Sequence, residues 1–316
     1  LYIRLAIPKN PSGTAFRHLA IGYDLHCHQN NIYNKRMLDL CDEREGLLPP
    51  QVNSFVRNRS ATDCNLVRKA VREDAEQAIK AGDPTVELSI ICADMQKFYD
   101  SIYSDAKYLA LHALGAPKRL QDVYSETSFE NEFQVKTTEG STAITPHEAG
   151  ERQGNTTACM AANFINILLI QTLKNRQLMY KMRCQDAASI HPDKLGFNYC
   201  DDSENLPEGG YETREVARKI GMWSVANRIG INNYLKSFFS MVCSDPTRYI
   251  DSIEINAYDR DQETILPIRI DRLKNGHQKS LGILLGTQAD THEVQDPAVP
   301  QLARLCTLGR EVRKST

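Results

Sequence analysis

The chain has 316 residues, of which 41% are hydrophobic and 25% are charged, which is typical of a globular protein with one large domain or two to three subdomains. A formal net charge of −2 gives no global signal for nucleic-acid binding, so such binding has to come from local basic clusters. No apolar run approaches the roughly 20 residues of a membrane span. Nine scattered cysteines without a CxxC pair argue against a disulfide framework and favour a reducing compartment, nucleus or cytoplasm.

The first half of the sequence mixes strands and helices. The opening residues already resemble the interior of a fold, so we expect a piece of a longer protein. Two short strands form a predicted hairpin, and a helix follows that Ser60 or Thr62 caps and Gly82 ends. A nearly continuous apolar run then predicts a buried strand that ends on Asp94. The expected ranges are strands 2–8 and 16–23, helix 61–81, strand 85–93, helix 98–114 and a polar surface excursion over 116–150 with a hairpin at 133–144.

The second half begins with the most hydrophobic helix of the chain, which Asn155 to Thr157 can cap and which should be buried. An amphipathic helix and several short strands follow it. These ranges are strand 194–200, helix 211–230, and strands 237–243, 252–258, 264–272 and 280–286. Because strands and helices mix without a regular βαβ repeat, the pattern favours an α+β fold.

Acidic residues follow two of the expected strands. Asp94 ends one, and Asp201 and Asp202 follow the other in "FNYCDDSENL". One interpretation is a polar turn, because aspartate tolerates turn geometry. The other is a metal site: if the strands are neighbours, three carboxylates meet at one sheet edge, where they repel unless cations are bound. Two Mg²⁺ ions, with Mn²⁺ as an alternative, suit such oxygen ligands.

Other candidate residues surround this sheet edge. Arg152 and Gln153 offer hydrogen-bond donors beside Gly154, Lys236 is a long flexible cation, and Tyr99 can floor a sugar pocket. The alternatives without a functional role are that residues 152–154 only form a helix N-terminus, that Lys236 is a solvated lysine, and that Tyr99 is a core aromatic. Four arginines are either phosphate contacts or a solvated face: Arg57, Arg59, Arg68 and Arg72. "HCH" at 26–28 lacks a second spaced pair, which favours a solvated or packed segment over a metal cluster.

Several motifs occur in an order that resembles the palm of reverse transcriptases. They are "ICADMQKFYDSI", "GERQGNTTACMAANFIN", "FNYCDDSENL", "RIGINNYLKSFFSM" and "SLGILLG". The segments "IPKNPSGTAFRHLAI" and "LPPQVNSFVRNRSATD" are similar to the fingers of the same family. The match covers about residues 3 to 286 and is closest to the non-LTR retroelement, group II intron and retron branch.

The resemblance implies roles for single residues. Asp94 and Asp201 would be metal ligands, Asp202 would support them, and the backbone carbonyl of Met95 would join. Tyr99 would be the steric gate that excludes a ribose 2′-hydroxyl, and Lys236 would protonate the departing pyrophosphate. The remaining implied roles are triphosphate contacts (Lys9, Arg17), the nucleotide and template pocket (Gln153, Gly154), a family asparagine on the buried helix (Asn163) and the primer grip (Leu281, Gly282).

The sequence also departs from the family pattern. Ala158 and Cys159 occupy places where the family carries Ser-Pro, and His18 follows Arg17 where the family has proline. After the aspartates the family has an apolar strand, whereas "SENLPEGG" is polar, which puts the length of the second hairpin strand in question. Only about thirty residues follow "LGILLG", so we expect little or no thumb.

The resemblance implies a right-hand polymerase fold of the α+β class, with an antiparallel palm sheet backed by helices. The expected division is fingers at 1–87, palm with the first aspartate motif at 88–114, a fingers/palm excursion at 115–150, palm at 151–286, and the start of a thumb or a linker at 287–316.

The implied function is RNA-directed DNA polymerisation in a retroelement. The partners would be an RNA template, a DNA or RNA primer, dNTPs and further domains of a longer polyprotein, with no membrane. One alternative is an RNA-dependent RNA polymerase, for which glycine before the aspartate pair and a polar residue in place of Tyr99 would be expected. The other is a domesticated RNA-binding module without activity.

Overall fold

The computed structural model describes residues 2–8, 16–21, 24–43, 47–128, 131–137, 140–147, 150–151, 156–174, 178–183, 196–233, 236–273, 277–280 and 283–286. The chain divides into two compact units, Leu1–Arg272 and Leu273–Thr316. Among the described residues, no helix is both long and apolar enough to cross a membrane.

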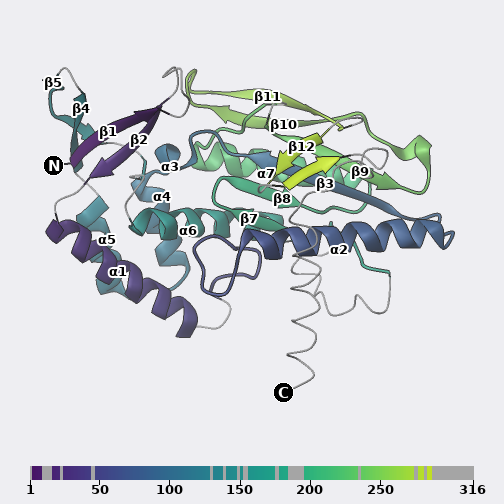
Figure 1. The fold of residues 1–316 in the computed structure, drawn as a ribbon, viewed down its shortest axis with the longest axis horizontal. Helices are drawn as coiled ribbons and strands as arrows, with labels where there is room; N and C mark the ends of the chain where they lie inside the picture. The colour runs from purple at the N-terminus through teal and green to yellow at the C-terminus, as the bar shows by residue number, and fades with distance from the viewer. Residues whose placement is uncertain are drawn as a thin grey trace. The chain divides into compact units, whose positions relative to one another are not determined.

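The centre of the first unit is a four-stranded antiparallel sheet in the order β7-β8-β3-β9 (Figure 1). Its middle strand β3 has six consecutive buried residues between its two ends, as its apolar sequence predicts. Strands β7 and β8 form a tight hairpin, and β9 pairs with the other edge of β3. The bounds are β3 Glu87–Asp94, β7 Phe197–Tyr199, β8 Asp202–Asn205 and β9 Phe238–Cys243.

Helices α2 (Ala61–Lys80) and α7 (Gly210–Asn227) pack on opposite faces of this sheet. Arg68 of α2 contacts Glu204, which lies directly opposite Cys92 in the sheet, so α2 covers the Cys92 face. Thr213 of α7 donates a hydrogen bond to Ser89 at 2.8 Å. Because side chains alternate along a strand, Ser89 and Cys92 face opposite sides.

Helix α2 begins where the sequence predicts. Ser60 caps it in a capping box with Asp63, in which each side chain accepts a hydrogen bond from the other residue's backbone N–H. Gly82 follows the helix with a φ of +86°. The capping interpretation of Ser60 is therefore confirmed.

A second sheet contains the N-terminal hairpin. Strands β1 and β2 pair antiparallel, as expected, and β4 adds in parallel to β1. Strand β4 also pairs with β5, within the hairpin predicted at 133–144, and with β6. The bounds are β1 Tyr2–Pro8, β2 Phe16–Ile21, β4 Asn131–Thr137, β5 Gly140–Ser141 and β6 Thr145–His147.

The remaining helices differ from expectation in three places. Helix α1 was not predicted, because it is mostly polar and buries only a narrow stripe that includes Tyr33, Met37 and Cys41. The helix expected at 98–114 is two helices, because Ile102 and Tyr103 are extended. The excursion at 116–150 contains α5, whose Tyr124 is buried, so this part belongs to the core. The bounds are α1 Asp24–Glu43, α3 Phe98–Ser101, α4 Ser104–Ala113, α5 Lys118–Ser128 and α6 Thr156–Leu173.

Two further hairpins complete the description. In the first unit, a 3-10 helix at Pro246–Arg248 precedes β10 (Ser252–Asp259), which pairs with β11 (Thr264–Asp271) and packs on α7. Gly221 of α7 permits this packing, since a Cβ there would lie 2.6 Å from the Asn256 carbonyl oxygen. In the second unit, β12 (His277–Ser280) pairs with β13 (Ile283–Gly286).

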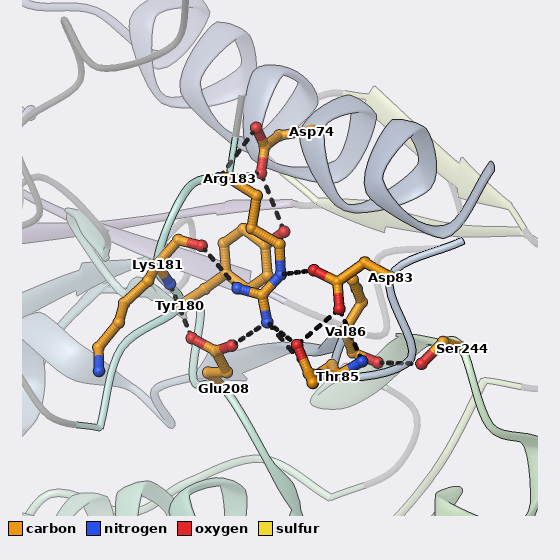
Figure 2. A network of polar contacts seen from close by, with 9 residues as sticks. All are labelled: Asp74, Asp83, Thr85, Val86, Tyr180, Lys181, Arg183, Glu208 and Ser244. Atoms are coloured by element: carbon orange, nitrogen blue, oxygen red, sulfur yellow. Dashed lines mark hydrogen bonds and ion pairs between the residues drawn. The ribbon is translucent and has the colours of Figure 1, made fainter. Parts of the chain in front are cut away.

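A polar network lies beside the start of β3, the end of that strand opposite Asp94. Figure 2 shows its side chains. The guanidinium of Arg183 is paired with Asp83 at 3.1 Å and with Glu208 at 2.5 Å. Asp74 of α2 accepts a hydrogen bond from the hydroxyl of Tyr180 and another from the backbone N–H of Arg183, both at 2.9 Å. The segment after α6 is thereby tied to α2 and to the start of β3.

Candidate functional site

The carboxylates of Asp94 and Asp202 lie at the same end of the central sheet. Asp94 is the last residue of β3 and Asp202 is the first residue of β8, and the two are direct partners in the antiparallel register. Direct partners project their side chains to the same face of a sheet. β8, which begins with Asp202, is therefore the neighbour of β3, whereas β7, the strand that the aspartate pair follows, lies one strand further away. The carboxylates of Asp94 and Asp202 come together through β8.

Asp201, the third aspartate, lies in the turn between β7 and β8. Its carbonyl oxygen accepts a hydrogen bond from the Met95 N–H at 2.8 Å, which ties the turn to the residue after Asp94. Cys200 adopts a left-handed backbone with φ of +58°, which is strained for a residue with a side chain. The Asn166 side chain donates to the Cys200 carbonyl at 3.0 Å, so α6 holds the turn in place. The hairpin bend that places Asp201 is thus fixed from both sides.

Asp94 has three polar neighbours from the segment before β9. Lys236 Nζ lies 3.3 Å from Asp94 Oδ2, and the Asn232 side chain donates a hydrogen bond to the same oxygen. The Asp94 N–H donates to Ser237 Oγ at 3.1 Å. Lys236 remains 64% exposed, so its ammonium is available to a ligand at this edge. The predicted site residue Lys236 therefore lies beside the predicted Asp94.

Burial, together with the neighbouring charges of Asp201 and Asp94, raises the pKa of Asp202 to about 7. At neutral pH such a carboxyl is about half protonated, and a bound cation would favour its charged form. Among the residues with described side chains, however, no set of three or more His, Cys, Asp or Glu side chains forms a ready metal cluster. Carboxylate oxygens are the ligand type that a hard divalent cation prefers. The aspartate side chains would have to move closer together to bind one.

Tyr99 lies next to the aspartate turn. Burial, followed by the neighbouring Cys200 side chain, raises the pKa of Tyr99, so its hydroxyl stays neutral at physiological pH. Tyr99 is partly buried and its ring lies edge-on to Phe98 at 5.8 Å. The structure thus places Tyr99 beside Cys200 and Asp201, which lie in the turn between β7 and β8.

The buried helix α6 carries two asparagines among mostly apolar residues. Asn163 exchanges two hydrogen bonds with Ser54: it accepts from the hydroxyl at 2.8 Å and donates to the carbonyl at 2.9 Å. Asn166 holds the Cys200 turn, a role that the sequence did not reveal. A buried polar side chain requires a partner, so these two interruptions were a usable signal for contacts that position the site.

The polar stretch after the aspartates is a buried strand. Ser203, Glu204 and Asn205 of β8 are all at most 3% exposed and pair with β3. Glu204 is accommodated by an ion pair with Arg68, whose side chain is 5% exposed. Arg68 is therefore neither a phosphate contact nor part of a solvated face, which were the two interpretations of its sequence.

Other basic candidates have varied surroundings. Arg59 donates hydrogen bonds to the carbonyls of Pro49, Val52 and Leu48 at 2.6 to 3.2 Å, so its guanidinium braces its own loop. Arg57 is 56% exposed and lies 3.4 Å from Asp39. Nucleic-acid binding by Arg57 and Arg59 stays a prediction.

Some of the predicted site residues lie partly or wholly outside the described residues. Arg17 lies on β2 opposite Ile7, and its side chain is outside the described residues. The other predicted residues outside them are Lys9, Arg152, Gln153, Gly154, Leu281 and Gly282.

No protein-family model matches the chain, and no curated protein is found to be related to it in sequence. Solved structures do match. A telomerase from Candida tropicalis, solved in complex with a fragment of telomeric RNA, aligns with 94% of this chain at a TM-score of 0.54 and 11% identity. The corresponding Candida albicans complex aligns with 81% at a TM-score of 0.50 and 12% identity. The chain spans less than half of each structure, 45% and 43%.

Telomerase is a reverse-transcriptase-family enzyme, so these matches show a reverse-transcriptase-like fold for this chain. At this identity the likeness extends to the fold alone. It supports no assignment to the retroelement, group II intron and retron branch.

Proposed function

We propose that the chain is the catalytic core of an RNA-directed DNA polymerase, which extends a primer 3′-hydroxyl with dNTPs. The observation that supports this most directly is the register of the sheet, which sets Asp94 opposite Asp202 with Asp201 in the adjoining turn. The reverse-transcriptase-like fold and the ordered motifs agree with it. An RNA template is proposed because the telomerase structures of similar fold contain RNA.

In this proposal each residue at the sheet edge has a task. Asp94 and Asp201, supported by Asp202 and joined by the Met95 carbonyl, would hold two divalent cations such as Mg²⁺. When bound, the cations supply positive charge for nucleotidyl transfer. Tyr99 excludes a ribose 2′-hydroxyl from the nucleotide pocket. Lys236, which is exposed and 3.3 Å from Asp94, donates a proton to the departing pyrophosphate.

The element type rests on the motifs alone. They favour a retroelement, whereas the solved structures of similar fold are telomerases. Placement in the nucleus or cytoplasm, and membership of a longer polyprotein, belong to the same proposal.

A second candidate function is an RNA-binding module without activity. Two observations favour it. The described side chains form no ready metal cluster, and the Asp94 carboxylate is already paired with Lys236 and hydrogen-bonded by Asn232. In this case Asp94 would serve only to anchor the segment before β9.

Primer extension distinguishes the candidates. The full chain is given an RNA template, an annealed primer, Mg²⁺ and either dNTPs or rNTPs, alongside Asp201→Asn. The proposal predicts extension with dNTPs that Asp201→Asn abolishes. A preference for rNTPs indicates an RNA polymerase. No extension by the parent, with equal RNA affinity of parent and variant, supports the binding module.

A further inference from the structure

A second buried group of ionisable side chains lies close to Tyr99. It consists of Lys107 on α4, Tyr124 on α5 and Glu151 in the segment before α6. Lys107 and Glu151 form an ion pair, with side chains only 2% and 6% exposed. The Tyr124 hydroxyl donates to the same Glu151 oxygen at 2.9 Å, and Lys107 Nζ lies 5.5 Å from the centre of the Tyr124 ring. Because buried charges require partners, these three side chains fix one another's positions.

The backbone of Glu151 is joined directly to Tyr99. The Glu151 N–H donates to the Tyr99 carbonyl at 2.5 Å, and the N–H of Gly150 donates to the Ile102 carbonyl at 2.9 Å. Gly150 has a φ of +103°, and a Cβ there would lie 2.9 Å from Cα of Asp100. The two backbone segments therefore lie in close contact, with no space for a side chain between them. Any displacement of Glu151 must move the short helix that carries Tyr99.

We propose that Glu151, held by Lys107 and Tyr124, is a positioning residue for Tyr99 and sets the discrimination between deoxyribonucleotides and ribonucleotides. The inference rests on the proposed function, since Tyr99 contacts a sugar only in a polymerase. A steric gate excludes a hydroxyl by occupying its space, so a small shift of the ring admits the wrong sugar. The buried ion pair connects Tyr99 to α4 and α5, and this connection resists such a shift.

The specificity test compares Glu151→Gln and Lys107→Met with the parent full chain in primer extension. Each variant should lower the ratio of kcat/KM for dNTPs to kcat/KM for rNTPs by about tenfold or more. Glu208→Gln is the matched control. Like the two test variants it breaks an ion pair, here the one between Glu208 and Arg183 (Figure 2), but this pair lies near the start of β3, away from Tyr99. An unchanged ratio in both variants overturns the inference. So does a ratio that follows the free energy of unfolding across all variants, the control included.

A second measurement does not depend on activity. Hydrogen exchange reports the amides of Gly150 and Glu151, which donate to the segment that carries Tyr99. In Glu151→Gln and Lys107→Met these two amides should exchange at least about tenfold faster, while the amides of β3 keep their parent rates. Unchanged protection of the two amides overturns the inference. If the parent extends no primer, the proposed function fails, and the exchange rates still decide whether Glu151 positions Tyr99.

Discussion

The ion pair between Arg68 and Glu204 gives a stability prediction that can be worked out from the structure. Both side chains are almost fully buried, at 5% and 1% exposure, and they join α2 to the strand that begins with Asp202. Arg68→Met removes the cation and leaves the Glu204 carboxylate in the interior without it. Removing one partner of a buried pair typically costs about 3–5 kcal/mol. This is a large part of the roughly 5–15 kcal/mol by which a domain is stable.

Replacing both partners should cost far less. Arg68→Met/Glu204→Leu buries two apolar side chains in place of two charges, and such exchanges are often neutral or stabilising. We therefore expect the double variant within about 1 kcal/mol of the parent, or above it. The assay is equilibrium unfolding in urea, followed by far-ultraviolet circular dichroism without divalent cations.

The neighbouring residue on α2 provides the control. Lys69 pairs with Glu73 on the surface, with side chains 66% and 54% exposed, so Lys69→Met should change stability by less than about 1 kcal/mol. The reasoning is refuted if Arg68→Met costs no more than Lys69→Met. It is also refuted if the effects of Arg68→Met and Glu204→Leu simply add in the double variant.

Three further predictions concern the site and its supports. The Asp202 carboxyl has a folded pKa of about 7 against 3.8 in the unfolded chain, so its contribution is fully present below pH 4 and is lost as pH rises to 7. Without metal, the free energy of unfolding should fall by up to about 4 kcal/mol as the pH rises from 4 to 7, and Asp202→Asn should remove this fall; an equal dependence on pH in the variant contradicts the prediction. Ser54→Ala should cost about 1–3 kcal/mol in urea unfolding, because it removes the donor to Asn163, and a smaller loss means that the bond contributes little. Gly221→Ala should lower the melting temperature by forcing β10 away from α7, since its Cβ would meet the Asn256 carbonyl; an unchanged melting temperature rules out the close packing.

Local sequence signals predicted the elements whose burial follows one clear pattern. The continuous apolar run of β3, the capping residue Ser60 before α2 and the largely apolar sequence of α6 each determine their own structure. Helix α1 escaped prediction because only a narrow stripe of its mostly polar surface is buried. The break at Ile102 depends on the chain at Gly150, which donates to the Ile102 carbonyl, and a local pattern cannot report such a contact.

The candidate site was predictable in its residues and not in its connections. The aspartates end two recognisable strands, but only the register of β3 and β8 makes Asp94 and Asp202 neighbours. The polarity of "SENL" put the length of the second hairpin strand in question, whereas Glu204 is buried in β8 and paired with Arg68, which lies 136 residues earlier in the chain. Hydropathy describes each residue alone, so it cannot reveal a charge that is neutralised by a distant one.

The Arg68–Glu204 pair also constrains how this chain can diverge. A substitution of either residue alone passes through a protein that has lost much of its stability, whereas the loss of both is nearly neutral. Two neutral end states are thus separated by an unfavourable intermediate, so single mutations rarely cross from one to the other. Descendants of a common ancestor should therefore carry both charges or neither, and a lineage that has acquired the pair should tend to keep it.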